Sequence, residues 1–189
     1  MTEIRWHGRG GQGAKTAALL LADVAFSTGL NIQGFPEYGP ERMGAPITAY
    51  NRLDSAPITI HSNIYYPDMV VIVDESLIES VDVTAGLKEG GAILVNSSRS
   101  PKELRKLLAE CDGDLYIVDA NRISKKYLGR NLPNTPLLSA VVRILNIMER
   151  DAFFENMKAS FAHKFASKQG VIEGNLSSLR EAWEGVVKA

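Results

Sequence analysis

A cluster of four glycines near the amino terminus is the feature that most constrains this chain. The cluster follows a short β-prone run, Ile4 to Trp6, and precedes a long segment of apolar periodicity over residues 14–26. A glycine turn between a strand and a helix is what a phosphate-binding loop requires, because glycine adopts positive φ and lets a ligand approach the helix amino terminus. The cluster is therefore a candidate phosphate-binding loop, made of Gly8, Arg9, Gly10, Gly11, Gln12 and Gly13.

Two better-defined nucleotide loops do not match this spacing. In a Walker A loop the lysine directly follows the second glycine, whereas here Ala14 separates Gly13 from Lys15. A nicotinamide site would have an acidic residue about 20 positions after the loop, at the end of the second strand, but residues 30–34 carry no carboxylate. A tight strand-to-helix turn that binds no ligand therefore remains open beside the phosphate site.

Composition limits the class of protein. A length of 189 residues favours a single domain, residues 1–189, and a net charge of −1 argues against a nucleic-acid partner. The one cysteine, Cys111, can form no internal disulfide and cannot supply the ligands of an iron–sulfur cluster, and the three histidines lack metal-ligand spacing, so no metal site is expected. The sequence shows neither a signal-peptide pattern nor a membrane span, which predicts a cytoplasmic protein.

Strand and helix patterns alternate along the chain. Apolar runs typical of buried parallel strands lie at 69–73, 92–95 and 115–118. Helical patterns are expected over 14–27, from 101, over 119–128, from 134 to about 148, over 151–165 and over 176–187. This order predicts an α/β fold: a three-layer, Rossmann-like, mainly parallel sheet with an antiparallel hairpin and C-terminal helices.

Local signals refine this prediction. The hairpin is expected between residues 47–53 and 57–61. Ser76 with Glu79, and Ser100 with Glu103, are spaced as capping boxes that begin helices. Residues 36–46 contain three prolines and two glycines, so they are expected to form a structured loop.

Taken with the glycine cluster, the segment 35–46 resembles the gamma subunit of 2-oxoacid:ferredoxin oxidoreductases. The similarity continues through 66–71, 79–83 and 132–136, so it covers most of the chain. The Gly44-Ala45-Pro46 ending is similar to the pyruvate and branched-chain 2-oxoacid branch. Relatives often carry two arginines before that glycine, and here Met43 stands in the second position, so an anion contact by that side chain is not carried over.

The resemblance implies a multi-subunit enzyme that oxidatively decarboxylates a 2-oxoacid, with pyruvate favoured, to an acyl-CoA and passes electrons to ferredoxin. Thiamine diphosphate, Mg²⁺ and iron–sulfur clusters would then lie on partner subunits of alpha, beta and delta type. This chain would be an accessory subunit with no catalytic residue of its own and would be inactive when isolated. Its glycine loop would hold a phosphate of coenzyme A.

The segment 35–46 is also a candidate for subunit docking, because it places large apolar side chains in a loop that cannot bury them all. An isolated chain would then either form a homodimer through this segment or leave it mobile. Two alternatives to the oxidoreductase subunit with a coenzyme A site are a free-standing nicotinamide- or flavin-binding Rossmann oxidoreductase and a purely structural interaction subunit. The candidate interface residues are Phe35, Glu37, Tyr38, Gly39, Glu41, Arg42, Met43 and Gly44.

Overall fold

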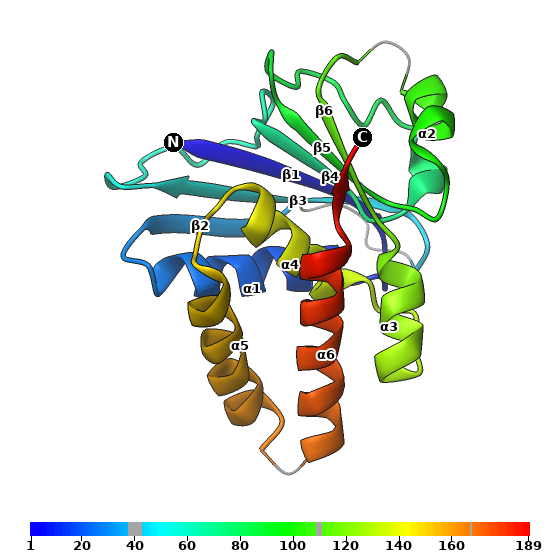
Figure 1. Cartoon of the computed structure of the whole chain (residues 1–189). Helices are drawn as coiled ribbons and strands as arrows, with labels where there is room; N and C mark the ends of the chain where they lie inside the picture. The colour runs from blue at the N-terminus through cyan, green and yellow to red at the C-terminus, as the bar shows by residue number, and fades with distance from the viewer. Residues whose placement is uncertain (38–42, 109–110, 167) are drawn as a thin grey trace.

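The structure, a computed structural model, describes residues 1–37, 43–108, 111–166 and 168–189. In these residues one seven-stranded sheet has the order β2-β3-β1-β4-β5-β6-β7 (Figure 1). The strands are β1 (Thr2–Arg9), β2 (Asn31–Pro36), β3 (Pro46–Asp54), β4 (Met69–Ile72), β5 (Ala92–Asn96), β6 (Asp114–Val118) and β7 (Val187–Lys188). The helices are α1 (Ala14–Phe26), the 3₁₀ turn η1 (Glu75–Leu77), α2 (Pro101–Leu107), α3 (Ala120–Leu128), α4 (Asn134–Ile144), α5 (Arg150–Lys164) and α6 (Gln169–Gly185).

The core of the sheet is parallel and its margins are antiparallel. Strands β1, β4, β5 and β6 run parallel, while β3 pairs with β1, β2 with β3, and β7 with β6 in antiparallel registers. The mainly parallel α/β fold predicted from the strand–helix alternation is thereby confirmed.

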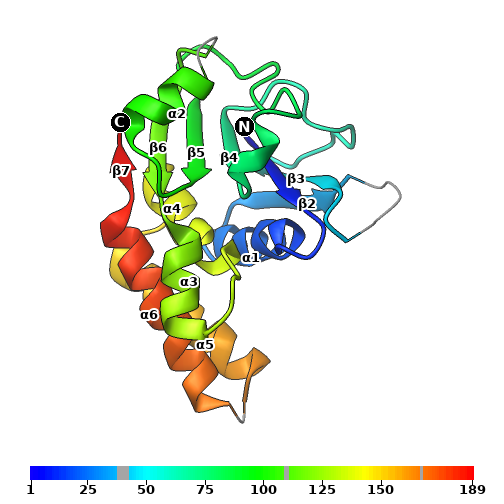
Figure 2. The ribbon, with the colours of Figure 1, turned by 90° about the vertical axis from the view of Figure 1, so that its right-hand side faces the viewer.

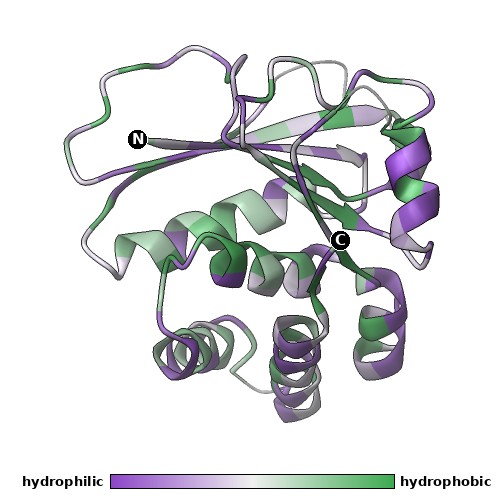
Figure 3. Cartoon of the chain, turned by 45° about the horizontal axis from the view of Figure 1, so that its top comes forward, coloured by the Kyte–Doolittle hydropathy of each residue, from purple (hydrophilic) through white to green (hydrophobic). Residues whose placement is uncertain are grey.

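Each central strand is buried on both faces, which makes the domain three-layered. Alternate residues of β4, such as Met69 and Val71, pack against α1 and the C-terminal helices, whereas Val70 and Ile72 join a second core under η1 and α2. Figure 2 shows α2 standing apart from α1, α3 and α6. In Figure 3, α1 carries mostly hydrophobic shades and α2 carries hydrophilic residues on its outer face. The apolar runs of these strands follow from this double burial.

The predicted antiparallel hairpin has a different partner. Strand β3 pairs through residues 46–53 with β1 and through 49–54 with β2, so both of its edges are occupied and residues 57–61 form coil. Two polar contacts at Asn51 tie this arrangement to the helical layer. Its amide oxygen accepts from the Trp6 indole at 2.9 Å, and its amide nitrogen donates to the Ala18 carbonyl at 2.8 Å.

Helix boundaries agree to within one residue at α1, α3 and α5 and at the start of α2, and they differ elsewhere. The Ser100–Glu103 capping box is present. The predicted cap at Ser76 is not, because Asp74 is the N-cap of η1 and its carboxylate accepts the Ser76 N–H. Helix α4 ends at Ile144, earlier than the predicted 148. Helix α6 begins at Gln169, not at 176, and Val187 belongs to β7, where pairing with β6 replaces the last helical turn.

Two buried arginines hold coil over the face of β1 and β3 that lies opposite α1. Arg52, 1% exposed, donates to the carbonyls of Ile60 and Asn63, each at 3.4 Å, and its Nε donates to Glu3 at 2.9 Å. Arg5 donates to the carbonyls of residues 83 and 85. Coil carbonyls lack ladder partners, and the five N–H groups of a guanidinium can satisfy several of them at once.

His7 is buried beside Arg5 and is held neutral. The Arg5 Nε donates to the His7 Nε2 at 3.0 Å, which requires an unprotonated nitrogen. Burial, followed by the nearby Arg5 charge, lowers the pKa of His7 from 6.5 to about 4.

This pKa shift predicts a loss of stability in mild acid. An unfolded chain protonates His7 near pH 6.5 while the folded chain resists until about pH 4, so the free energy of unfolding falls as pH decreases through that window. The loss should be on the order of 2–3 kcal/mol at pH 4. Urea unfolding from pH 7.5 to 4 should show a steeper decline for the natural chain than for His7→Gln, whose side chain does not titrate. Parallel curves for the two proteins would refute the assignment.

Candidate functional site

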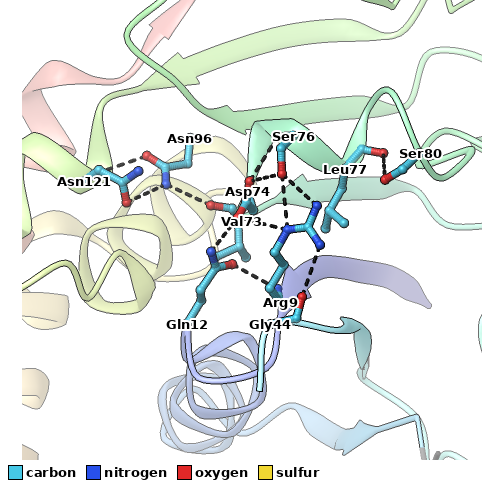
Figure 4. A network of polar contacts seen from close by, with 10 residues as sticks. All are labelled: Arg9, Gln12, Gly44, Val73, Asp74, Ser76, Leu77, Ser80, Asn96 and Asn121. Atoms are coloured by element: carbon cyan, nitrogen blue, oxygen red, sulfur yellow. Dashed lines mark hydrogen bonds and ion pairs between the residues drawn. The ribbon is translucent and has the colours of Figure 1, made fainter. Parts of the chain in front are cut away.

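The candidate site lies at the edge of the sheet where the parallel strands end. Strand β1 leads into α1 on one face, whereas β4 leads into η1 on the other, so a crevice is expected between the carboxyl ends of these two neighbouring strands. The glycine cluster enters this edge from β1, and Asp74 enters it from β4 (Figure 4).

The glycine loop is a tight turn closed by its own side chain. Gln12 donates its backbone N–H to the Arg9 carbonyl at 3.1 Å, and its side-chain oxygen accepts the Arg9 N–H at 2.9 Å. Gly11 and Gly13 have φ of 93° and 85°, which other residues rarely adopt.

Close contacts within the chain surround these glycines. A Cβ at Gly13 would lie 3.0 Å from the Cβ of Asn134, at the start of α4, and one at Gly11 would lie 3.1 Å from the Met43 Cε. A Cβ at Gly8 would lie 3.1 Å from that of Ala14. The three positions therefore permit close approach of the chain to itself, whether or not a ligand binds.

Arg9 and Gln12 converge on Asp74 across the switch point. The Gln12 amide donates to Asp74 Oδ2, and the Arg9 Nε lies 3.4 Å from the same oxygen (Figure 4). Arg9 also donates to the Ser76 hydroxyl at 2.9 Å and to the Gly44 carbonyl at 3.1 Å. The network joins the glycine loop, the end of β4 and the approach to β3.

Asp74 is ionised in this network. Burial alone would raise the pKa of its carboxyl, but hydrogen bonds from Ser76 and Gln12, together with the Arg9 charge, outweigh burial and hold the pKa below its usual value. An ionised Asp74 neutralises Arg9, so the most prominent cation of the loop already has an anionic partner.

The next strands along the edge contribute further polar groups. The Asn96 amide donates to the Val73 carbonyl at 2.8 Å and to the Asn121 side chain at 3.0 Å. Beyond it, the Ser97 hydroxyl donates to Glu75. Sequence analysis did not identify Asp74, Asn96, Asn121 or Asn134 as site residues. Polar residues directly after apolar strand runs are the signal that could have identified the first two.

The two sequence segments that carry the resemblance meet in space. The Gly10 N–H donates to the Ala45 carbonyl at 2.9 Å, and the Gly44 N–H donates to the Gly10 carbonyl at 3.1 Å. Met43 lies over Gly11 and is 87% exposed. Tyr38, Gly39, Glu41 and Arg42 of the candidate interface lie outside the described residues.

The remaining interface candidates, Phe35 and Glu37, engage their own sheet. The Phe35 ring lies 5.2 Å from the Tyr50 ring, and Arg52 stacks over it at 5.6 Å. The Tyr50 hydroxyl donates to Glu37 at 3.1 Å. Phe35 is half-buried rather than exposed as the loop prediction required.

In a nicotinamide site, the acidic residue that binds the ribose hydroxyls lies at the end of the strand next to β1. Here β3 occupies that position, and Glu37 at the end of β2 is one strand further away, about 10 Å from β1. The strand order therefore argues against a nicotinamide site, as does the lack of a carboxylate in residues 30–34.

Within the described ranges, no group of three or more His, Cys, Asp or Glu side chains is placed to hold a metal ion. Over the same ranges, no helix is both long and apolar enough to cross a bilayer.

These features define a three-layer Rossmann-like domain with a glycine loop at its switch point, and comparison with known proteins gives its family. The family pattern described as "Pyruvate ferredoxin/flavodoxin oxidoreductase" matches residues 3–185. The chain belongs to this family, and within it to the gamma subunits of pyruvate/ketoacid ferredoxin oxidoreductases, as the residues of the two segments indicated.

The similarity to known proteins covers nearly the whole chain. The pyruvate/ketoisovalerate oxidoreductases common subunit gamma of Thermococcus litoralis is 44% identical over 187 residues, covering 99% of this chain and 98% of that protein. The pyruvate synthase subunit PorC of Thermotoga maritima is 42% identical over 184 residues, covering 97% and 94%.

Solved structures support the same fold. The crystal structure of pyruvate oxidoreductase subunit PORC from Thermotoga maritima superposes with a TM-score of 0.85 at 38% identity, covering 100% of this chain and 98% of that one. The 2-oxoglutarate:ferredoxin oxidoreductase of Magnetococcus marinus, at a TM-score of 0.76 and 19% identity, shares the fold over all of this chain and 32% of its own.

The contact of Gly13 with Asn134 predicts a position-dependent cost of alanine. Gly13 and Gly29 both have φ near 83°, at 85° and 82°, but nothing lies within 4 Å of a Cβ at Gly29. Gly29→Ala should cost about 1 kcal/mol for backbone strain alone, whereas Gly13→Ala should cost about 2–3 kcal/mol because Asn134 must also move. Thermal or urea unfolding measures both values, and adding Asn134→Gly should reduce the excess. Equal costs at the two glycines would contradict the packing role.

Proposed function

We propose that this chain is a non-catalytic, accessory gamma subunit of a complex that oxidatively decarboxylates a 2-oxoacid to an acyl-CoA. The names of the similar proteins support pyruvate as the favoured substrate. Thiamine diphosphate with Mg²⁺ and the iron–sulfur clusters are assigned to partner subunits of alpha, beta and delta type, with ferredoxin as the electron acceptor. A single cysteine supports this division, because a cluster needs several thiolates.

The observation that carries the coenzyme A part of the proposal is the amino terminus of α1. Its N-cap is Gly13, which has no side chain to accept the first-turn N–H groups, and the first turn carries no acidic residue. The exposed Lys15 adds a positive charge to the same turn. Backbone N–H groups, helix dipole and lysine fit a phosphate group, and coenzyme A when bound would supply the thiol that receives the acyl group.

Arg9 and Gln12 are not placed to contact the phosphate directly. Both side chains are bonded to Asp74, and a phosphate next to that carboxylate would meet repulsion. We therefore assign to Gln12 the positioning of the loop rather than a direct contact with the ligand. The oxygen of its side-chain amide accepts from Arg9 and the nitrogen donates to Asp74, and α1 begins two residues later at Ala14.

Gln12→Ala tests the coenzyme A site in the intact complex. Loss of both amide bonds should loosen the loop, raise the KM for coenzyme A about tenfold and change kcat by less than about twofold, since the proposal gives this region the phosphate end of coenzyme A and not its thiol. Gln169→Ala, which removes an exposed amide on α6, is the matched control and should leave both values unchanged. Steady-state assays with pyruvate and a viologen dye measure the two constants. An unchanged KM would leave the glycine loop with a structural role only.

We further propose that the segment 35–46 forms part of the surface on which the partner subunits dock. Support comes from Met43, whose 87% exposure is unusual for a large apolar side chain, and from the tie between Gly44 and the glycine loop. Phe35 and Glu37 would act as the internal support of this surface, because they already contact β3.

Hydrogen exchange distinguishes docking from internal packing. The amides of 43–45 should exchange at least about tenfold more slowly in the complex than in the isolated chain, because an interface excludes water from the segment. The amides of α2, which lies away from β2 and β3 in Figure 2, serve as the internal control. Equal protection of 43–45 in both samples would show that the segment packs on its own domain alone.

A further inference from the structure

A cavity of about 410 Å³ opens between the helices on the α1 side of the sheet. Residues from α1, α3, α4, α5 and α6 line it. Its exposed lining residues include Lys164 at the end of α5 and Lys168, Gly170 and Val171 at the start of α6, so we take this end as its mouth. The two helices stand side by side below α1 in Figure 1. Asn134 separates it from the glycine loop, because that side chain lines the cavity and also packs on Gly13. The network at Asp74 contributes no residue to its wall.

The inner wall of the cavity is apolar and its polar groups are satisfied. Leu20 and Phe161, 6% and 2% exposed, belong to the main core and form part of the wall with Leu128. The Thr135 hydroxyl donates to the Asn175 side-chain oxygen at 3.1 Å, and the Asn175 amide donates to the Val171 carbonyl at 2.8 Å. Such a wall favours the hydrocarbon or aromatic body of a ligand.

The mouth is cationic. Arg130, Lys164 and Lys168 line it, all three are exposed, and the lining contains no aspartate or glutamate. Over the ranges that the structure describes, none of the three has a carboxylate within 4.0 Å, and the same holds for other exposed cations such as Lys15, Lys125 and Lys158. What distinguishes Arg130, Lys164 and Lys168 is that they share one opening whose described lining residues include no carboxylate.

We propose that this cavity binds a small amphipathic anion, with a carboxylate or phosphate at the cationic mouth and an apolar body against the inner wall. The volume lies within the roughly 300–1,000 Å³ of small-molecule sites. The positive charge of the mouth favours an anion. The aliphatic parts of the Lys164 and Lys168 side chains can pack against the ligand while their amines stay in water. The cavity shares Thr16 with the first turn of α1, but no residue of the glycine loop lines it.

Octanoate and octanamide form a matched pair of probes for this site. Titration of the full chain, followed by amide NMR shifts, should place octanoate at Thr16, Gly170 and Val171, with an affinity about tenfold above that of the neutral octanamide. The double variant Lys164→Gln/Lys168→Gln should lose about tenfold in octanoate affinity. Lys158→Gln, an exposed lysine on α5 outside the lining, should leave the affinity unchanged.

A second variant tests the apolar part. Val171→Trp should fill the cavity and reduce the affinity for both probes at least about tenfold, while the thermal midpoint reports whether the chain still folds. Shifts confined to other surfaces, equal affinity for the two probes, or an unaltered affinity of the double variant would each overturn the proposal. An acidic peptide that binds the mouth and is not displaced by octanoate would overturn it in favour of a partner-subunit segment.

Discussion

The antiparallel pairing of β3 with β1 is the contact on which the rest of this structure depends. It extends from Thr2 opposite Leu53 to Arg9 opposite Pro46, along the whole of β1. At one end it brings Gly44 and Ala45 to Gly10, which joins the two sequence segments typical of the family. It also separates β2 from β1. In a nicotinamide-binding Rossmann domain the acidic residue that binds the ribose lies at the end of the strand next to β1, and here that strand is β3.

The two faces of the paired strands β1 and β3 are covered in different ways. On one face, α1 and the C-terminal helices bury apolar side chains, and Asn51 supplies the polar contacts to Trp6 and Ala18. On the other face of β1 and β3, coil takes the place of a helix. Its carbonyls are satisfied by Arg5 and Arg52, so hydrogen bonding does there what hydrophobic packing does opposite.

The glycine loop combines a structural and a functional interpretation without conflict. Gly8, Gly11 and Gly13 each permit a contact within the chain, and the Arg9–Gln12–Asp74 network holds the turn closed. The loop leads into the amino terminus of α1, where we propose that a phosphate binds. The cavity around Lys164 and Lys168 lies on the opposite side of Asn134 and has the apolar wall that the loop lacks.

Sequence by itself determined the elements that local chemistry specifies. The glycine turn and α1, the apolar runs of β4, β5 and β6, and the Ser100–Glu103 capping box depend on neighbours within a few residues, and the structure has them where the pattern predicted. Tertiary structure alone decided the rest. Residues 57–61 have strand propensity but no free edge of β3 to pair with, Val187 left a helix to pair with β6, and Asp74 reached the glycine loop only because β4 lies beside β1. Pairing between distant strands sets these features, and no local pattern encodes which strand edge remains free.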